Sequence, residues 1–467
     1  MKNTNGRTHS YQSSPAGSFA SASRRLALTA LLLCGLAIST SAQEAGSYKI
    51  AAEKGFTVVP NVQTPIVLKT MPDAACDLHA ESLGASDHKL RFYANGDGYV
   101  KIHARAKQES EDGIHAQLDC QANGKAMRYP LHLRASSSPT PGMPAPQSVM
   151  PVPKGSQVMP ALSGQEAQQL SDEELIGRGF PPRPDASRSP DAYATWLDLI
   201  SQPITMVSSH LVSRTDIVHS VSSQADSQQQ GVQNGFGTSS NWSGYVSQGS
   251  YRGFIAAYGQ WNVPSIVACE SNTTTYSSFW VGLDGWGLQD LVQDGTEHDC
   301  TDFLGFNFTS YSAWEELLPN QPYSQNVSLS INPGDSFWAL AWVGDANRYY
   351  DPNGTYAWFN MWDTTKRQGV LVGVALGSTH YNGSTAEWVL ERPTVGGKFA
   401  QLSDYNTALM SSPSILTSSF NWDAYSSFSN TEIWLYNNYQ SGNDNNLLSA
   451  AAGSGSASIY YYWFNYH

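Results

Sequence analysis

The sequence predicts an all-β protein whose largest part is a β-sandwich or jelly roll. From Asn241 onward, aromatic residues, Gly, Asn, Ser and Thr are frequent and charged residues are rare. Short segments of strand character recur there between turn dipeptides such as Asn353-Gly354 and Asn382-Gly383, and helical periodicity is almost absent. These features are typical of one large sandwich domain, which we place at residues 236–467.

The N-terminal end has the pattern of a secretory signal peptide. Arg24 and Arg25 precede an apolar run at residues 26–38, and small residues follow it up to Ala42. The run is too short to span a bilayer comfortably. We therefore expect residues 1–42 to be removed, and the mature protein to be secreted or periplasmic, with no membrane partner.

Composition divides the residues before the sandwich into three further regions. Residues 43–134 alternate apolar and polar positions, with Gly and Asn between them, which predicts a small antiparallel β module. Residues 135–164 are rich in Ser and Pro and should form an extended linker. Residues 165–235 begin with a short helical segment. They end in a stretch rich in Gln, Ser and Gly, residues 222–240, which should be exposed and easily cut.

The excess of acidic charge is confined to the C-terminal region. Residues 236–467 contain 19 Asp and Glu against 6 Lys and Arg, whereas residues 1–235 contain 20 of each kind. This excess disfavours nucleic acid as a partner. Because protonation of carboxylates relieves the repulsion between them, the domain should tolerate or prefer acid; solubility alone is the other explanation.

The cysteine count suits an oxidising compartment. Of five cysteines, Cys34 lies in the predicted signal peptide, which leaves four. Their order along the chain favours Cys76 with Cys120 and Cys269 with Cys300, although four cysteines allow three connectivities.

Familiar catalytic motifs are missing, but an amide and a carboxylate stand out. The sequence has no HExxH, GxSxG or glycine-rich phosphate motif and no pair of CxxC motifs, and we expect no metal or cofactor. Gln293 and Glu391 lie in the strand-like segments LVQDG and AEWVLE. An amide can hold a water molecule against a carboxylate and then donate to a developing oxyanion. The pair therefore points to attack by water, and a structural glutamate is the alternative.

Strand alternation predicts which side chains share a face. Glu387 and Glu391 should lie on one face of their strand, as should Gln293 and Gly295 on theirs. For Glu387 we favour a structural role over a catalytic one.

Seven motifs in this order resemble those of the glutamic peptidase (eqolisin) family, whose members are secreted acid endopeptidases. They are NWSG (241–244), WNVP (261–264), WVGLDG (280–285), LVQDG (291–295), SAWEELLP (312–319), GDS (334–336) and AEWVLE (386–391). The resemblance covers about residues 236–467. It implies a lectin-like sandwich of two antiparallel sheets with a substrate groove across one face. GFPPRPD, from Gly179, also resembles the propeptide of bacterial relatives.

The resemblance assigns roles to six residues. It places the catalytic glutamine at Gln293 and the catalytic glutamate at Glu391. Residues that bind substrate or support the site fall on Trp280, Asp284, Trp314 and Glu316.

The sequence departs from the family pattern in three places. Glu297 stands where fungal members have an aspartate, and Leu317 and Leu318 replace an aromatic pair. Arg392 follows the catalytic glutamate where an aspartate is common. The first two departures can reshape side-chain pockets, and the third can alter the pKa of Glu391.

We therefore expect a secreted, monomeric acid endopeptidase that hydrolyses proteins and peptides. It should be made as a zymogen and cleaved between about Thr215 and Asn241. Two alternatives are a glycoside hydrolase that uses Glu316 and Glu391, and a carbohydrate-binding lectin. Peptide cleavage, sugar release and ligand retention without turnover distinguish the three.

Overall fold

The computed structural model describes residues 55–80, 90–138, 148–222, 235–271, 273–303, 305–437, 446–455 and 457–467. Two predicted regions lie outside these ranges. They are the signal peptide and residues 223–234 of the stretch that we expected to be easily cut. Within the described ranges, no helix is long and apolar enough to cross a membrane.

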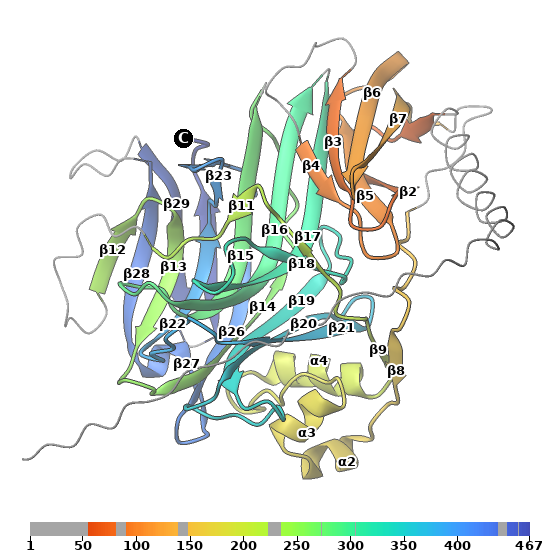
Figure 1. Cartoon of the computed structure of the whole chain (residues 1–467). Coiled ribbons are helices and arrows are strands. Elements are labelled where there is room, and N and C mark those ends of the chain that lie inside the picture. The colour runs from red at the N-terminus through yellow and green to blue at the C-terminus, as the bar shows by residue number, and fades with distance from the viewer. Residues whose placement is uncertain are drawn as a thin grey trace, which may run out of the picture. The chain divides into compact units, whose positions relative to one another are not determined.

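The C-terminal domain is a sandwich of two largely antiparallel sheets (Figure 1). In the front sheet the strand order is β12–β28–β13–β22–β15–β16–β17, and only the first of these pairs is parallel. The strands are β12 (Gly235–Ser239), β13 (Trp242–Gln248), β15 (Thr274–Asp284), β16 (Leu291–Phe303), β17 (Phe306–Leu318), β22 (Thr385–Glu391) and β28 (Ser429–Tyr436).

The back sheet has the order β30–β26–β14–β19–β20–β21. Its strands are β14 (Phe254–Asn262), β19 (Ser336–Gly344), β20 (Tyr356–Asp363), β21 (Gln368–Ala375), β26 (Thr407–Thr417) and β30 (Ser458–Trp463). Strand β29 (Leu447–Ser454) pairs with both β28 and β30, so hydrogen bonding continues from one sheet to the other. Short elements complete the domain: β18 (Gln325–Val327), β23 (Thr394–Val395), β24 (Lys398–Phe399), β25 (Gln401–Leu402), β27 (Trp422–Ala424) and the 3-10 helix η1 (Tyr425–Ser427).

Alternation along the strands creates both the core and the functional face. Phe279, Val281 and Leu283 of β15 are buried in the core cluster, where they meet side chains of β19 such as Phe337. Burial of each such side chain contributes about 1.5–3 kcal/mol. The intervening residues of β15, among them Trp280, must therefore lie on the outer face of the front sheet.

The N-terminal module is joined to the front sheet. Five of its strands form a separate sheet in the order β1–β7–β6–β3–β4, whereas β2 and β5 pair with each other and β5 pairs with β17. The bounds are β1 (Phe56–Val58), β2 (Thr64–Lys69), β3 (Ala75–Ala80), β4 (Leu90–Tyr93), β5 (Tyr99–Ala106), β6 (Ser110–Ala122) and β7 (Lys125–Ala135). Phe306 and Phe308 of β17 belong to the module's apolar core.

Both disulfides favoured by the order of the cysteines are confirmed. Cys76 of β3 is bonded to Cys120 of β6, within the N-terminal module. Cys269 is bonded to Cys300 of β16, which ties the loop before β15 to the neighbouring strand.

The segment between module and sandwich, which we call the prosegment (residues 148–222), covers parts of both sheets. Its elements are β8 (Gln157–Met159), α2 (Gly164–Gln169), α3 (Asp172–Gly177), α4 (Pro190–Ile200), β9 (Ile204–Met206), β10 (Leu211–Ser213) and β11 (Ile217–Val218). Helices α2 and α3 begin at capping boxes formed by Ser163 with Glu166 and by Ser171 with Glu174.

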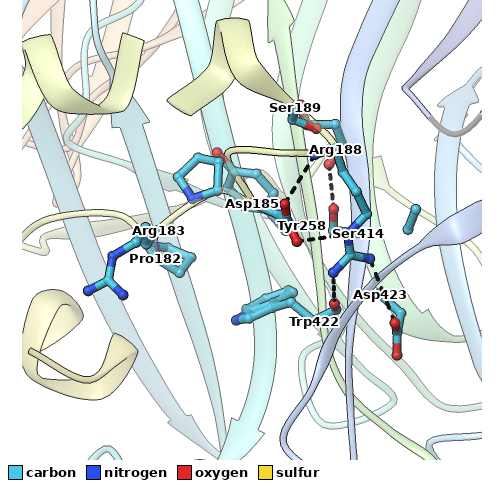
Figure 2. A pocket seen from close by; sticks show the side chains of 12 residues that line it. Pro182, Arg183, Asp185, Arg188, Ser189, Tyr258, Ser414, Trp422 and Asp423 are labelled. Carbon is cyan, nitrogen blue, oxygen red and sulfur yellow. Dashed lines mark hydrogen bonds and ion pairs between the residues drawn. The ribbon is translucent and has the colours of Figure 1, made fainter. Parts of the chain in front are cut away.

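The helices pack on the outer face of the back sheet. One apolar cluster contains Trp196 of α4 together with Trp338 and Trp362 of the back sheet. The indole of Trp362 donates to the carbonyl oxygen of Gly179, at the start of the GFPPRPD motif. Figure 2 shows the pocket beside this motif, where Arg188 contacts Asp185 of the prosegment and Asp423 of the domain.

The stretch 222–240, which we expected to be exposed, is not exposed at Ser222 or at Ser239. Ser222 and Ser239 are buried, and their hydroxyl groups lie 3.2 Å apart in a hydrogen bond. Residues from Gly235 form β12, which pairs with β28. The polar composition of this stretch predicted exposure. Small Ser and Gly side chains can nevertheless be buried, because they fit between backbones that approach closely.

We predict that Trp196→Ala loosens the prosegment from the back sheet. Trp196 is fully buried and its indole donates to the carbonyl oxygen of Pro181. The loss should be about 3–5 kcal/mol of the free energy of unfolding, because a large cavity is left behind. Urea unfolding measures it, and limited proteolysis should cut the prosegment faster. Thr195→Ala, on the exposed side of the same helix, is the control and should change stability by less than about 0.5 kcal/mol. Equal stability of the two variants would contradict the packing described here.

Candidate active site

Register brings the candidate residues onto one face of four adjacent strands, β22, β15, β16 and β17. Three rows of side chains cross this face. They are Glu391–Ser278–Glu297–Ser312, Val389–Trp280–Gly295–Trp314 and Glu387–Gly282–Gln293–Glu316. The expected sharing of faces by Glu387 with Glu391 and by Gln293 with Gly295 is therefore found. We call this surface the front face.

Glycines on the front face make room for the Trp280 indole. A Cβ atom at Gly295 would lie 2.6 Å from the Cβ atom of Trp280, and one at Gly282 would lie 3.0 Å from its ring. The indole Nε1 of Trp280 donates to Oε2 of Glu391 over 2.9 Å. Trp280 thus fixes the direction of one oxygen of the carboxyl group.

The prosegment crosses the front face and touches three of the candidate residues. Nε2 of Gln293 donates to the carbonyl oxygen of His219 over 3.2 Å. The backbone N–H of Ser220 donates to Oε1 of Glu391 over 3.0 Å. The backbone N–H of His219 donates to Oε2 of Glu316 over 2.9 Å. Gln293 and Glu391 thus hold the two polar atoms of one peptide bond.

The side chain of His219 fills a pocket on the same face. Its ring stacks on Trp314, with centroids 3.6 Å apart and planes at 10°. Nδ1 lies 3.2 Å from Oε2 of Glu391, and Nε2 lies 3.5 Å from Oε2 of Glu297. The ring is fully buried. No local pattern singled out His219, since it is a lone histidine in a short apolar stretch far from every motif.

Further contacts fix the chain on both sides of His219. Ile217 and Val218 form β11, which pairs with β23 of the domain. After His219, the carbonyl oxygen of Ser220 accepts from Nε1 of Trp242 over 3.0 Å. Nδ2 of Asn241 donates to the same oxygen. Both Asn241 and Trp242 belong to the NWSG motif, so two residues of this motif bind the backbone of the prosegment.

Burial controls the ionisation of the front-face carboxyl groups. It raises the pKa of Glu391 well above its ordinary value, against the opposing effect of hydrogen bonds from Ser220 and Trp280. Burial likewise raises the pKa of Glu316 and of Glu297, the latter with help from neighbouring Asp299. These groups therefore keep their protons at pH values where an exposed glutamate has lost its own.

A buried ion pair joins the prosegment to this acidic cluster. Nη2 of Arg214 lies 3.0 Å from Oδ2 of Asp299, and both side chains are almost fully buried. Arg214 also contacts Asp216 within the prosegment. Burial raises the pKa of Asp299, although the guanidinium of Arg214 opposes the shift.

Asp284 contacts the loop that leads into β22. Its carboxylate accepts hydrogen bonds from the backbone N–H groups of Asn382, Gly383 and Ser384, in the loop that leads into β22. Burial raises its pKa to about 6. Asp284 thus positions the strand that carries Glu391, without touching the prosegment peptide bond.

The residues that depart from the family pattern have separate environments. Leu317 lies in the sandwich core and Leu318 packs beside the front-face cluster. Arg392 donates to the carbonyl oxygen of Ser240 and to Asn437, and it does not contribute to the pKa shift of Glu391. Among the described residues, no group of His, Cys, Asp and Glu is arranged to hold a metal ion.

We predict that the folded protein is more stable at pH 5 than at pH 8. Burial raises the pKa of Glu315, on the core side of β17, from 4.5 to about 8. Between these values the folded chain keeps a proton that the unfolded chain has released, so the free energy of unfolding falls as pH rises. Thermal unfolding at several pH values measures this. Glu315→Gln cannot titrate and should flatten the dependence; an unchanged slope in this variant would contradict the assignment.

The comparisons with known proteins agree with the motifs. Residues 240–461 match the model of the Peptidase A4 family. No curated protein matches the chain. Similar solved structures include scytalido-glutamic peptidase with a peptide-based transition state analog, at 19% identity and a TM-score of 0.36, covering 48% of this chain and 98% of that one. SCP-B, a member of the eqolisin family in complex with the tripeptide Ala-Ile-His, has 20% identity and a TM-score of 0.35 over the same shares. On the strength of the family match, residues 240–461 of this chain form a domain of the Peptidase A4 family, the glutamic peptidases.

Proposed function

We propose that this chain is a secreted acid endopeptidase made as a zymogen, in which Glu391 and Gln293 hydrolyse peptide bonds of protein substrates. One observation carries the assignment of these two residues. The amide of Gln293 and the carboxyl group of Glu391 bind the carbonyl oxygen and the N–H of a single peptide bond. The two disulfides and the apolar run after Arg25 support secretion.

The contacts support a role for each group in hydrolysis. In its ionised form, Glu391 takes a proton from a water molecule as that water attacks the carbonyl carbon. The amide of Gln293 donates to the oxygen that becomes negatively charged, a contribution of about 3–4 kcal/mol for one such donor. Glu391 then passes its proton to the leaving nitrogen, which in the present contacts is 3.0 Å from Oε1. No covalent intermediate with the enzyme is formed.

Burial suits Glu391 to the second of these tasks. A carboxyl group with a raised pKa is a ready proton donor in mildly acidic solution. The Trp280 indole keeps Oε2 in place while Oε1 faces the scissile nitrogen. Glu316, which binds the N–H of His219, aligns the substrate backbone on the other side of the carbonyl group.

The prosegment makes the precursor inactive, since it occupies the position that a substrate requires. Acid should release it. Arg214 is held by Asp299, whose raised pKa means that it takes up a proton in mild acid. Protonation removes the negative half of the pair and leaves a buried guanidinium with less compensation, which weakens the hold of the segment.

We predict that Glu391→Gln and Gln293→Ala each abolish hydrolysis of denatured protein. Loss of the proton-transfer group should lower the rate by about 100- to 10,000-fold. Loss of the oxyanion donor should lower it by about 100- to 1,000-fold. Release of peptides from denatured substrate at pH 3–5 measures both rates, and circular dichroism verifies the fold.

The variant Glu387→Gln tests which of the two glutamates on this face of β22 is catalytic. Glu387 is buried on β22 four residues before Glu391, and it lies opposite Gly282. It makes no described hydrogen bond to the prosegment peptide, so its removal should leave much of the rate. Full activity in Glu391→Gln together with a dead Glu387→Gln would move the catalytic assignment to Glu387.

We predict that Arg214→Ala matures at a higher pH than the unchanged precursor. Removal of one partner from a buried ion pair costs about 3–5 kcal/mol, here at the expense of prosegment binding. Arg188→Ala is the matched control, because Arg188 is 39% exposed and such pairs contribute about 0–1 kcal/mol. The measurement is the pH at which half of the precursor is processed. If the Arg214→Ala precursor is half processed at the same or a lower pH than the unchanged precursor, the ion pair of Arg214 with Asp299 does not hold the prosegment.

A further inference from the structure

One peptide bond of the prosegment already makes the contacts that hydrolysis requires. The carbonyl oxygen of His219 accepts from Gln293, and the N–H of Ser220 meets Glu391. The peptide bonds on either side have other partners. Glu316 binds the N–H of His219, and Trp242 binds the carbonyl oxygen of Ser220. The register of the segment on the front face is therefore defined to a single bond.

We propose that the His219–Ser220 bond is the first substrate of the chain itself, and that the pocket which holds His219 selects the side chain on the amino side of the cleaved bond. This inference rests on the proposed peptidase function and adds to it the bond that is cut and the residue type that is preferred. The ligand class is a peptide with an imidazole at that position.

The anchoring on both sides of the bond supports cleavage within one molecule. Before the bond, β11 pairs antiparallel with β23, and Ile217 is buried against Tyr276. After it, Ser222 donates through its N–H to the carbonyl oxygen of Gly285. Main-chain hydrogen bonds of this kind bind an extended peptide, while side-chain pockets supply selectivity. The reacting groups are thus already close together, which favours an intramolecular reaction.

The step balances with water as the second reactant. Oε1 of Gln293 has no hydrogen-bond partner within the described part of the chain, so it can accept a hydrogen bond from the attacking water. The water oxygen bonds to the carbonyl carbon of His219, and one water proton goes to Glu391. The bond from that carbon to the nitrogen of Ser220 then breaks, and Glu391 delivers the proton to this nitrogen. The products are a carboxyl group on His219 and an amino group on Ser220.

The pocket matches an imidazole in shape and in polarity. Trp314 offers a flat face at stacking distance, and the two ring nitrogens approach Glu391 and Glu297 from opposite edges. Burial, assisted by the charge of Arg214, lowers the pKa of His219 well below its ordinary value, which favours the neutral imidazole in this pocket. Apart from its contact with Asp299 on the same strand, Glu297 meets only the His219 ring among the described residues, so a side chain without a polar ring atom would leave an oxygen of this buried carboxyl group unsatisfied. Glu297 is therefore the residue that determines the preference for His.

The first experiment maps the cut. Purified full-length precursor is moved to pH 4 in water enriched in oxygen-18, and the fragments are identified by mass spectrometry. We expect a fragment that ends at His219 with one heavy oxygen in its new carboxyl group, and a partner that begins at Ser220. The rate should not depend on protein concentration. Ser220→Pro, which lacks the N–H that meets Glu391, should leave this bond intact.

The second experiment tests the pocket in trans. Matured protein and its Glu297→Gln variant are given two synthetic peptides of residues 215–222, one with His and one with Leu at position 219. The ratio of kcat/KM for His over Leu should fall by about tenfold or more in the variant, because the buried carboxyl group that faces Nε2 of the imidazole is lost. Asp423→Asn is the control, since Asp423 lies on β27 beside the back sheet, away from the front face, and should leave the ratio unchanged.

The outcomes separate this inference from the function on which it rests. If matured protein degrades denatured substrate but its N-terminus lies elsewhere and the His219–Ser220 bond is intact, self-cleavage at this bond is refuted and the peptidase assignment stands. A His-to-Leu ratio unaffected by Glu297→Gln refutes the pocket assignment. If no peptide or protein is hydrolysed at any pH, the proposed function itself fails.

Discussion

The buried carboxyl group of Glu391 is the constraint on which the rest of the front face depends. A carboxyl group without exposure must have its oxygens satisfied by hydrogen bonds. Trp280 on the neighbouring strand and the backbone of Ser220 both donate to it, and the ring of His219 contacts it as well. The same burial that demands these partners raises the pKa of Glu391. Removal of the Glu391 carboxyl group from water therefore has two consequences. In the proposed function it makes Glu391 a ready proton donor, and it makes Glu391 bind the backbone of a peptide.

A further consequence is that the covering peptide cannot leave without a substitute. When the prosegment departs, Glu391, Glu316 and Gln293 lose the backbone groups that they now bind. Water or the backbone of a substrate must replace them. An extended peptide supplies the same donors and acceptors in the same spacing, whatever its side chains. In the proposed function, one site can for this reason bind both the prosegment and the backbone of protein substrates.

The prosegment is held by two kinds of interaction at two places. On the back sheet the largest contact is an apolar cluster that includes Trp196 and Trp362, with the partly exposed ion pair of Arg188 and Asp423 beside it. On the front face the contacts are hydrogen bonds and the ion pair of Arg214 with Asp299, which depend on protonation. Acid should therefore loosen the front-face portion while the helices remain in place. The N-terminal module, joined through β5 to β17, adds a third attachment beside the hairpin that carries Glu316.

The sequence by itself determined the fold class, the candidates Gln293 and Glu391, and the order of the disulfide partners. It could do so because strand alternation, turn residues and short motifs are local properties of the chain. Alternation alone put Glu387 and Glu391 on one face, which the register confirms. Only the tertiary structure decided which distant groups meet. The pairing of Glu391 with Ser220, the stacking of His219 on Trp314 and the burial of Ser222 join residues separated by long stretches of chain. No local pattern encodes such contacts, because they arise from how sheets and prosegment pack together.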